Sequence, residues 1–218
     1  MAHRTLDLSL YLVTDTQLCA AAGVTATVVA AVGAGVTAVQ LRDPDADDDE
    51  LVALGRGLVA ALRGTGVPLL VNDRVDLVES VGADGAHIGQ GDLDPRSARD
   101  LLGPAALLGL SVQTWEHVAA ARAHGPDVLD YLGVGPVWAQ RTKPDAAAPA
   151  GLATLQDIVT ASPWPCVAIG GIDVERAPLV RAHGACGIAV VSAICGQVDV
   201  AAATRALRSA WDSGRDPR

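Results

Sequence analysis

An alternation of short apolar segments and helical patterns, repeated eight times, is the feature that most restricts the fold of this chain. The apolar segments are rich in β-branched residues and apolar at nearly every position, which is typical of strands covered on both faces. The predicted strands are Leu10–Thr14, Ala38–Arg42, Pro68–Val71, Gly85–Gly89, Leu107–Val112, Tyr131–Val137, Cys166–Ile169 and Gly187–Val191. The predicted helices are Thr25–Val32, Asp48–Leu62, Asp76–Val81, Pro95–Leu102, Trp115–Ala123, Leu152–Thr160, Val174–His183 and Val200–Trp211.

Eight strand–helix units with short connections predict an α/β protein built as a single closed (β/α)8 barrel, the TIM-barrel architecture. An open, doubly wound sheet is the competing architecture. The count of eight and the lack of a G-x-G-x-x-G sequence weigh against it. We expect the 218 residues to form one domain, with residues 1–9 as a lead-in and residues 213–218 as a frayed tail.

The composition restricts the class of partner. A formal net charge of −9 argues against nucleic-acid binding, which requires a basic surface. No apolar run reaches the length of a membrane span, and the first ten residues lack the apolar core of a signal peptide. We therefore expect a cytoplasmic protein that acts on small-molecule substrates, with no nucleic-acid or membrane partner. The sequence leaves open whether it is a homo-oligomer.

The cysteine and histidine residues give no sign of a catalytic cluster. The four cysteines show no C-x-x-C spacing, which disfavours a metal-binding or catalytic role. Cys166 and Cys186 lie in apolar runs and are expected to be small buried side chains. His87 lies inside the fourth predicted strand and is expected to be packed rather than catalytic. No Ser-His-Asp or Cys-His arrangement can be assembled.

Carboxylates follow two consecutive predicted strands, at the point where each strand ends. Asn72 and Asp73 come after the third strand, and Gln90 and Asp92 follow the fourth. The carboxyl ends of parallel strands meet on one face, where such proteins bind ligands. Two carboxylates there can share a hard cation such as Mg²⁺, which takes oxygen ligands and often a substrate phosphate. The alternative is that Asp73 and Asp92 each cap the following helix.

Other strand ends carry groups suited to binding anions. Gln40 and Arg42 are two residues apart and so lie on the same side of the second strand. Arg42 requires either an anionic ligand or an internal ion pair with Asp15 or Asp73. Ser111 ends the fifth strand.

The ends of the seventh and eighth strands predict a phosphate cradle. Gly170 and Gly171 follow the seventh strand, and Ser192 follows the eighth. Backbone N–H groups and a hydroxyl at these two loops form the usual phosphate site of such barrels. The alternative is two ordinary strand-to-helix turns.

The connection after the sixth strand is the longest polar one in the chain and carries Thr142 and Lys143. Lys143 is the only lysine in a sequence that otherwise uses arginine. Its compact, flexible ammonium favours a functional role, and a surface lysine is the alternative.

Nine short segments, spread in order from Tyr11 to Gly196, carry recognisable patterns. They are YLVTD (Tyr11–Asp15), VQLR (Val39–Arg42), VNDRVDL (Val71–Leu77), GAHIGQGD (Gly85–Asp92), LGLSVQT (Leu108–Thr114), DYLGVGPVW (Asp130–Trp138), TKPD (from Thr142), AIGGI (Ala168–Ile172) and GIAVVSAI (Gly187–Ile194). In combination they resemble the thiamine phosphate synthase family. The resemblance implies a Mg²⁺-dependent transferase. The ring nitrogen of a thiazole phosphate, or of its carboxylated form, would attack an aminopyrimidine methyl diphosphate, giving thiamine phosphate and diphosphate.

The resemblance also assigns roles to residues around the pyrimidine substrate. It implies that Gln40, Arg42 and Asn72 hold the pyrimidine diphosphate. Asp73 and Asp92 would hold Mg²⁺.

A second group of residues is placed at the reaction centre and around the thiazole phosphate. Ser111 and Lys143 would lie near the reacting carbon and the leaving group, and the resemblance implies that they act in catalysis with Arg42. The thiazole phosphate would lie near Thr142, in a cradle of Gly171, Val191 and Ser192.

The chain departs from the family pattern at two positions. Pro44 occupies a place that usually holds a lysine, which puts one diphosphate contact in question. Gln140 replaces a usual threonine in the loop after the sixth strand, and we keep it as a substrate-binding candidate. Two alternatives remain: a thiazole tautomerase, disfavoured because Gln113 stands where that enzyme has histidine, and a non-catalytic barrel that binds a phosphorylated metabolite.

Overall fold

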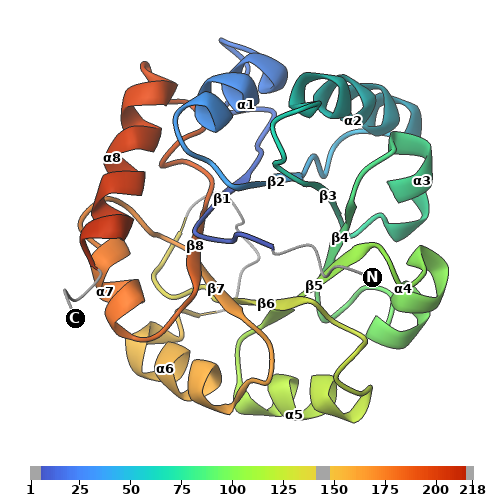
Figure 1. The fold of residues 1–218 in the computed structure, drawn as a ribbon, viewed down its shortest axis with the longest axis vertical. Coiled ribbons are helices and arrows are strands. Elements are labelled where there is room, and N and C mark those ends of the chain that lie inside the picture. Colours follow the sequence, from blue (N-terminus) through green and yellow to red (C-terminus); the bar gives the residue numbers. More distant parts are fainter. Residues whose placement is uncertain (1–5, 141–147, 215–218) are drawn as a thin grey trace.

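Eight parallel strands close into a barrel in the computed structural model, which describes residues 6–140 and 148–214. Figure 1 looks down the barrel and shows the strands as an inner ring with the helices outside it. Each strand pairs with the next along the chain, and β1 pairs with β8 to close the ring. The predicted (β/α)8 barrel is confirmed, and the open doubly wound sheet is wrong.

The strands and helices alternate along the whole chain. The strands are β1 (Leu10–Val13), β2 (Ala38–Leu41), β3 (Leu69–Asn72), β4 (Gly85–Ile88), β5 (Leu107–Val112), β6 (Tyr131–Val134), β7 (Cys166–Ile169) and β8 (Gly187–Val190). The helices are α1 (Val24–Gly33), α2 (Asp48–Leu62), α3 (Val78–Val81), α4 (Pro95–Leu102), α5 (Trp115–Ala123), α6 (Gly151–Ala161), α7 (Ala177–Ala182) and α8 (Val200–Ser213), with a 3₁₀ turn η1 (Val75–Leu77) before α3. Among the described residues, no helix has the length and apolar character needed to cross a bilayer.

Every predicted strand and helix has a counterpart, and the differences lie at the ends of elements. β6 ends at Val134, earlier than the predicted Val137, because Pro136 has no N–H group to donate to a strand ladder. The third helical pattern divides into η1 and α3, so this connection is shorter and tighter than the others.

The start of α7 also differs from the prediction. The helix begins at Ala177 rather than Val174. One oxygen of the Asp173 carboxylate accepts hydrogen bonds from the backbone N–H groups of Glu175 and Arg176. This short side-chain-to-backbone turn occupies the residues that periodicity alone assigns to the helix.

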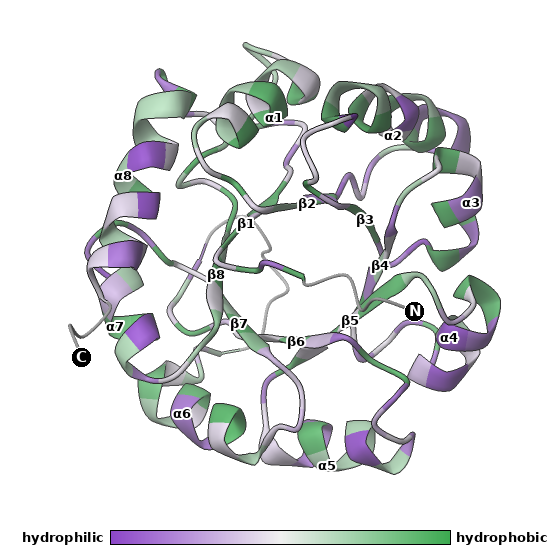
Figure 2. Ribbon diagram, viewed as in Figure 1, coloured by the Kyte–Doolittle hydropathy of each residue, from purple (hydrophilic) through white to green (hydrophobic). Residues whose placement is uncertain are grey.

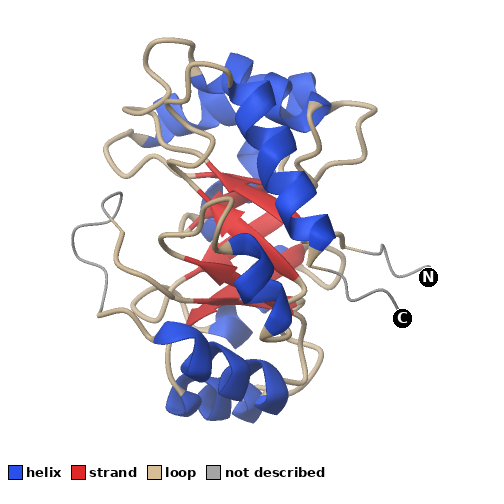
Figure 3. Cartoon of the chain, turned by 90° about the vertical axis from the view of Figure 1, so that its left-hand side faces the viewer, coloured by secondary structure: helices blue, strands red, loops and turns tan. Residues whose placement is uncertain are grey.

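Two apolar cores hold the barrel together. One fills the interior and includes Tyr11, Leu70, Tyr131 and Val167. The other lies between the strands and the surrounding helices. The side view in Figure 3 shows the sheet enclosed by helices, and Figure 2 shows that most polar residues of the helices face away from the barrel. The strands are therefore covered on both faces, which explains their continuous apolar character.

The segment before β1 closes one end of the barrel. Leu8 is buried, and Leu6 packs with it against the interior core. A Cβ atom added to Gly187 would lie within 1.7 Å of the Leu8 carbonyl oxygen, so the lead-in passes directly against β8. Figure 1 shows this segment crossing the ring. The amino-terminal end of the barrel is therefore filled, which leaves the carboxyl end for ligands.

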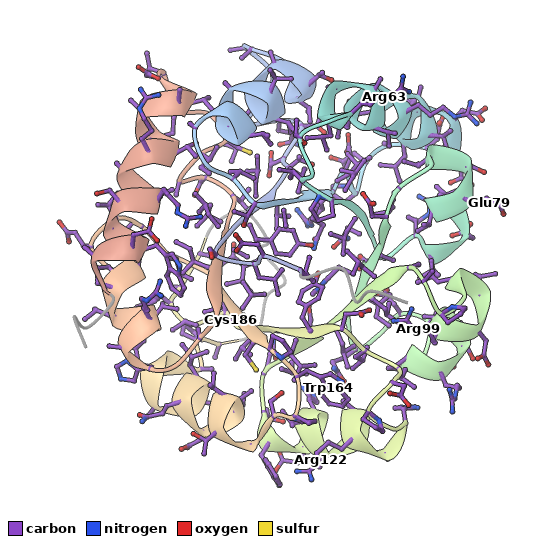
Figure 4. All side chains as sticks on the ribbon, in the orientation of Figure 1. Arg63, Glu79, Arg99, Arg122, Trp164 and Cys186 are labelled. Carbon is purple, nitrogen blue, oxygen red and sulfur yellow. The ribbon has the colours of Figure 1, made fainter. Side chains whose placement is uncertain are left out.

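The cysteine prediction holds at one position and fails at the other. Cys166, in β7, is buried, whereas Cys186 is exposed and lies just before β8 (Figure 4). Apolar neighbours in the sequence do not bury a residue at the very edge of a strand, so the expectation for Cys186 is wrong.

Candidate active site

Polar side chains enter the barrel interior toward the carboxyl ends of the strands. Residues paired in register point to the same side of a sheet, and alternate residues point to opposite sides. Gln40 pairs with Val13 and Leu70, both members of the interior core. Asn72, two residues after Leu70, therefore also points inward, as does its register partner His87. Gln40, Asn72 and His87 therefore share the inner face of the barrel, next to the apolar interior core.

Gln40 and Arg42 extend from the carboxyl end of β2. Gln40 is 4% exposed, and its Nε2 donates to the Tyr11 hydroxyl at 2.9 Å. The Thr14 hydroxyl accepts from the Arg42 backbone N–H at 2.9 Å and donates to its carbonyl at 3.2 Å, which fixes the strand end. In the described residues no ion pair joins Arg42 to Asp15 or Asp73, so the internal ion pair is wrong. The Arg42 guanidinium lies at an interior strand end and suits an anionic ligand.

Asp73 adopts a backbone conformation that is uncommon for a side chain-bearing residue. Its φ angle is 60°, in the left-handed region that Asp and Asn tolerate better than most residues. Its N–H donates to the His87 carbonyl at 2.8 Å and its carbonyl accepts from the Val75 N–H at 3.0 Å, which hold it there. Residues in such uncommon backbone conformations are frequent at active sites and ligand-binding positions.

Asp92 is held by the loop that follows β4. Its Oδ2 accepts from the Gly89 N–H at 2.7 Å, which folds the loop back over the strand end. The N-cap of α4 is Asp94, whose Oδ1 accepts from the N–H groups of Arg96 and Ser97. Helix capping is therefore the wrong explanation for Asp92.

Helix capping is also wrong for Asp73, because the N-cap position of η1 is Arg74 and makes no side-chain cap. Asp73 and Asp92 thus present carboxylates from the ends of adjacent strands, without a capping role. Within the described residues, no group of three or more His, Cys, Asp or Glu side chains could hold a metal ion by itself. Two carboxylates alone suit Mg²⁺, which keeps water and phosphate oxygens as its other ligands.

Ser111 and His87 meet inside the barrel. The Ser111 Oγ lies 2.9 Å from His87 Nε2, and His87 Nδ1 lies 2.8 Å from the Tyr131 hydroxyl. His87 is 7% exposed, so the expected packed position is confirmed. The Gln90 side chain donates to the Ser111 carbonyl and so ties the loop after β4 to β5.

Two buried tyrosines near this pair were missed by the sequence reasoning. The hydroxyls of Tyr11 and Tyr131 lie 2.9 Å apart, and both side chains are almost fully buried. Burial raises the pKa of Tyr11 to about 12 and raises the pKa of Tyr131 well above its ordinary value. The alternation of strand residues could have found them, because Tyr11 and Val13 must share a side of β1.

The loops after β7 and β8 present backbone N–H groups. In the described residues, the N–H groups of Gly171, Ser192 and Ala193 donate to no protein acceptor. Gly170 and Gly171 have φ angles of 101° and 66°, which favour glycine. A Cβ added to Gly171 would lie 2.7 Å from the Ala139 carbonyl oxygen. Two loops with unsatisfied donors at this end of the barrel fit the predicted phosphate cradle.

Two side chains brace this cradle. Arg176 donates to the Gly171 carbonyl, and its guanidinium lies 5.1 Å from the ring centre of Trp138. Gln197 donates to the Ser192 carbonyl at 2.8 Å. Both bonds use carbonyl groups, so the N–H groups of Gly171 and Ser192 stay available. Val191 supports the same turn, because its carbonyl accepts from the N–H groups of Ile194 and Cys195.

The loop after β6 is anchored to the loop after β7. The Val137 N–H donates to the Ile169 carbonyl and the Trp138 N–H donates to the Gly170 carbonyl. Gln140 is partly buried at the end of this anchored stretch. Thr142 and Lys143 lie outside the described residues, so their predicted positions stay predictions.

Comparisons with known proteins place this geometry in a family. Residues 10–194 match the family model described as thiamine monophosphate synthase. A thiamine-phosphate synthase of Azorhizobium caulinodans is 47% identical over 96% of this chain and 97% of its own. A thiamine-phosphate synthase of a Psychrobacter species is 50% identical over 88% of this chain and 90% of its own.

A solved structure agrees with these sequence relatives. The thiamine phosphate pyrophosphorylase from Pyrococcus furiosus superimposes with a TM-score of 0.86, at 34% identity, over 96% of this chain and 98% of its own. Both the sequence and the fold therefore match over nearly the full length. The chain belongs to the thiamine monophosphate synthase family.

Proposed function

We propose that this protein is a transferase that joins an aminopyrimidine methyl diphosphate to a thiazole phosphate, giving thiamine phosphate and diphosphate. The observation that carries the proposal is a pairing of sites at one end of the barrel. Two carboxylates, Asp73 and Asp92, extend from adjacent strand ends, and a cradle of backbone N–H groups lies at Gly171 and Ser192. The first site suits a diphosphate with its metal, and the second suits a single phosphate.

The pyrimidine diphosphate is assigned to the side of the barrel built by β2, β3 and β4. Gln40 and Asn72 point inward and offer amide groups to the ring or the ester. Arg42 pairs with the diphosphate charge, as its partly buried position at a strand end favours. Mg²⁺, when bound by Asp73 and Asp92, would neutralise negative charge on the departing diphosphate.

The bond changes need little from the protein besides charge and position. The bond between the methylene carbon and the diphosphate oxygen breaks, and its electron pair leaves with the diphosphate. The lone pair of the thiazole nitrogen forms the new carbon–nitrogen bond. That nitrogen carries no proton in its neutral form, so no general base is needed. Ser111 lies 2.9 Å from His87 Nε2, and the other ring nitrogen of His87 faces the Tyr131 hydroxyl at 2.8 Å.

The thiazole phosphate is assigned to the cradle opposite the diphosphate. The N–H groups of Gly171 and Ser192, with the Ser192 hydroxyl, would bind its phosphate, and Val191 shapes the turn. Ser111, held by His87, lies between the two sides on β5. The nitrogen of the thiazole can then approach the methylene carbon across the mouth of the barrel.

The loop after β6 supplies the remaining groups in this proposal. Lys143 would pair with the leaving diphosphate and Thr142 would contact the thiazole phosphate. Gln140, near the anchored start of the loop, would be a further substrate contact. Because Pro44 replaces a lysine, Lys143 and Arg42 carry the positive charge of the site. We propose that the reaction takes place in the cytoplasm, where the four unpaired cysteines would stay reduced.

The two alternatives find no support. Gln113 occupies the position where the tautomerase has histidine, and its N–H donates to His117 Nδ1 at 3.2 Å. A regulatory barrel has no use for two carboxylates beside a phosphate cradle. The family relatives over nearly the full chain are thiamine-phosphate synthases.

An assay for released diphosphate tests the proposal. Diphosphate should form when the aminopyrimidine diphosphate, the thiazole phosphate and Mg²⁺ are all present, and should stay at background when any one is omitted. Calorimetric titration with each substrate, with and without Mg²⁺, should show that only the diphosphate substrate needs the metal for tight binding. Binding of both substrates with no diphosphate release would instead favour the regulatory barrel.

A further inference from the structure

A continuous chain of hydrogen bonds crosses the interior of the barrel from β2 to β5. Gln40 Nε2 donates to the Tyr11 hydroxyl at 2.9 Å, and the Tyr11 and Tyr131 hydroxyls are 2.9 Å apart. The Tyr131 hydroxyl lies 2.8 Å from His87 Nδ1, and His87 Nε2 lies 2.9 Å from the Ser111 hydroxyl. Four successive bonds therefore connect two residues of the proposed site that lie on strands three places apart.

The surrounding strands leave room for this chain by omitting side chains. A Cβ added to Gly109 would lie 2.2 Å from Cζ of Tyr131, and one added to Gly133 would lie 2.9 Å from Cε1 of His87. The Tyr11 and Tyr131 rings meet edge to face at 6.0 Å. Two interior glycines and an aromatic contact thus fix the rings that carry the middle of the chain.

The direction of every proton in the chain follows from its first bond. Gln40 donates a hydrogen bond to the Tyr11 hydroxyl. The Tyr11 hydroxyl must therefore donate its own proton to the Tyr131 hydroxyl, because otherwise a buried polar group would be left without a partner. Tyr131 then donates to His87 Nδ1. Both phenols stay neutral because burial raises the pKa of each one. With Gln40 as the donor, only this order gives each hydroxyl an acceptor within the chain.

The same order fixes the imidazole and the serine. If Nδ1 accepts from Tyr131, the His87 ring carries its proton on Nε2 and donates to the Ser111 Oγ. Ser111 accepts that bond and keeps its own proton for a group at the mouth of the barrel. Gln40, at the other end, keeps its carbonyl oxygen and its second N–H for a ligand.

We propose that the Gln40–Tyr11–Tyr131–His87–Ser111 chain is an ordered proton array that fixes which groups at the two ends donate and which accept. Tyr11, Tyr131 and His87 are positioning residues in this array. The amide orientation of Gln40 and the hydroxyl orientation of Ser111 cannot then change independently, although no contact joins them directly.

The array predicts that the site prefers 4-aminopyrimidines to 4-oxopyrimidines. This consequence rests on the proposed function. A 4-aminopyrimidine offers a donating amino group beside an accepting ring nitrogen, which matches the free carbonyl and N–H of Gln40. A 4-oxopyrimidine offers the reverse pattern. Binding a 4-oxopyrimidine would require the Gln40 side-chain amide to rotate by half a turn. The buried chain opposes that rotation, because every hydrogen bond from Tyr11 to Ser111 would then have to reverse its direction.

The first test reads the array without any activity measurement. The ¹⁵N chemical shifts of His87, assigned by comparison with His87→Gln, report which ring nitrogen carries the proton. The wild-type protein should show the Nε2–H form. In Gln40→Glu, at about pH 8, an ionised carboxylate can only accept, so every bond should reverse and His87 should show the Nδ1–H form. The double variant Gln40→Glu/Tyr11→Phe interrupts the chain and should lose this effect.

Two outcomes of this test overturn the array. The first is an unchanged His87 tautomer in a folded Gln40→Glu variant with an ionised carboxylate. The second is the same reversal in the double variant, which would mean that the effect does not travel through Tyr11. If Gln40→Glu does not fold, the ¹⁵N chemical shifts of His87 are measured in Tyr131→Phe instead. Loss of the donor to Nδ1 should then shift His87 away from pure Nε2–H, and an unshifted spectrum rejects the array.

The second test asks whether the array acts on the reaction. Tyr131→Phe should lower kcat/KM for the aminopyrimidine substrate about tenfold to a hundredfold. It should also lower the ratio of this kcat/KM to the kcat/KM for the 4-oxopyrimidine analogue. His87→Gln, which keeps a donor toward Ser111, should retain more activity than His87→Phe. Thr204→Val removes a buried hydroxyl bonded to Val200 on α8 and should change neither number.

The outcomes separate the array from the proposed function. Equal losses toward both pyrimidines in Tyr131→Phe, with equal activity of His87→Gln and His87→Phe, would show a purely structural role and reject the array. A wild-type protein that releases no diphosphate would reject the proposed function alone, because the tautomer measurement needs no substrate.

Discussion

Asp73 and Asp92, the proposed metal ligands, are held in different local geometries, and each geometry determines which substitution tests it. Asp73 sits at a φ angle of 60°, which asparagine also tolerates. Asp92 uses one oxygen to accept from the Gly89 N–H, a bond that an asparagine carbonyl can keep. Substitution by asparagine at either position should therefore remove negative charge with little change in backbone.

We expect Asp73→Asn and Asp92→Asn to lower kcat by about 10²–10⁴-fold, the range that several kcal/mol of charge stabilisation gives. Both should raise the Mg²⁺ concentration needed for half-maximal activity, and thermal unfolding should stay near that of the wild type. Asp94→Ala is the matched control two residues from Asp92. It removes the N-cap of α4 and should cost roughly 1 kcal/mol of stability without changing the Mg²⁺ requirement. Normal turnover by either Asn variant would show that its carboxylate is not part of the proposed metal site.

Strand β5 and strand β6 are built around missing side chains. Gly109 lies in register with Tyr131, whose ring occupies the place of a Cβ at position 109. We expect Gly109→Ala to lower the free energy of unfolding by about 1–3 kcal/mol through overpacking, measured by urea denaturation. Gly33→Ala, at the end of α1 with nothing within 4 Å of the added Cβ, should not destabilise.

Coupling to the ring can be checked in the same series. In Gly109→Ala/Tyr131→Leu the smaller leucine side chain no longer occupies the place of the alanine Cβ. The double variant should therefore lose less free energy of unfolding than the sum of the losses in the two single variants. Strict additivity would show that the ring is not what excludes a side chain at position 109.

The sequence predicted the elements better than it predicted their interior contacts. Apolar runs and helical periodicity located every strand and helix, because burial on both faces dictates those patterns. The ends of β6 and α7 depend on a proline and on an Asp173 turn, which periodicity does not report. Strand ends also gave the positions of Asp73 and Asp92.

What the sequence did not reveal is which inward residues touch across the barrel. Tyr11 and Tyr131 are 120 residues apart, and their contact depends on the closure of eight strands. The expected burial of His87 was right, but its bonds to Tyr131 and Ser111 required the register of β4, β5 and β6. Pairings of this kind are set by tertiary structure and have no local pattern.

At the scale of the whole molecule, the buried tyrosines make folding sensitive to alkali. The pKa of Tyr11 is about 12 in the folded protein, whereas an unfolded chain has the ordinary value of 10.0. The folded state thus holds its proton more tightly, so its stabilisation is complete below pH 10 and is lost as pH rises toward 12. Tyr131 shifts in the same direction and adds to the loss.

Urea unfolding at about pH 8 and about pH 11 tests this expectation. The free energy of unfolding should fall steeply between them, by an amount on the order of 1–3 kcal/mol. Tyr11→Phe should be less stable than the wild type at the lower pH and should show a smaller fall. An equal fall in both proteins would place the alkaline sensitivity elsewhere.

The two ends of the barrel divide the work of the molecule. At the amino-terminal end, the buried Arg99 guanidinium joins two loops (Figure 4) by donating to the carbonyls of Gly103, Ala106 and Val128 and to the Asp130 carboxylate. At the carboxyl end, Ser192 is exposed, and the N–H groups of its loop, at Ser192 and Ala193, have no protein acceptor among the described residues. Stability should depend on the first end and substrate binding on the second.

Arg99→Ala and Ser192→Ala should therefore give opposite phenotypes. Arg99→Ala leaves three carbonyls without this donor and removes the cation from the partly buried Asp130 carboxylate, which among the described residues keeps only the Leu108 N–H, and we expect a loss of about 3 kcal/mol in the free energy of unfolding. Its kcat and KM should stay near wild-type values at a temperature where it is folded. Ser192→Ala should keep its stability within about 0.5 kcal/mol. It should raise the KM for the thiazole phosphate by the equivalent of roughly 1.5–3 kcal/mol, the worth of a hydrogen bond to a charged group. A rise in the KM for the pyrimidine diphosphate alone would mean that the two substrates bind at the opposite sides of the barrel from those proposed.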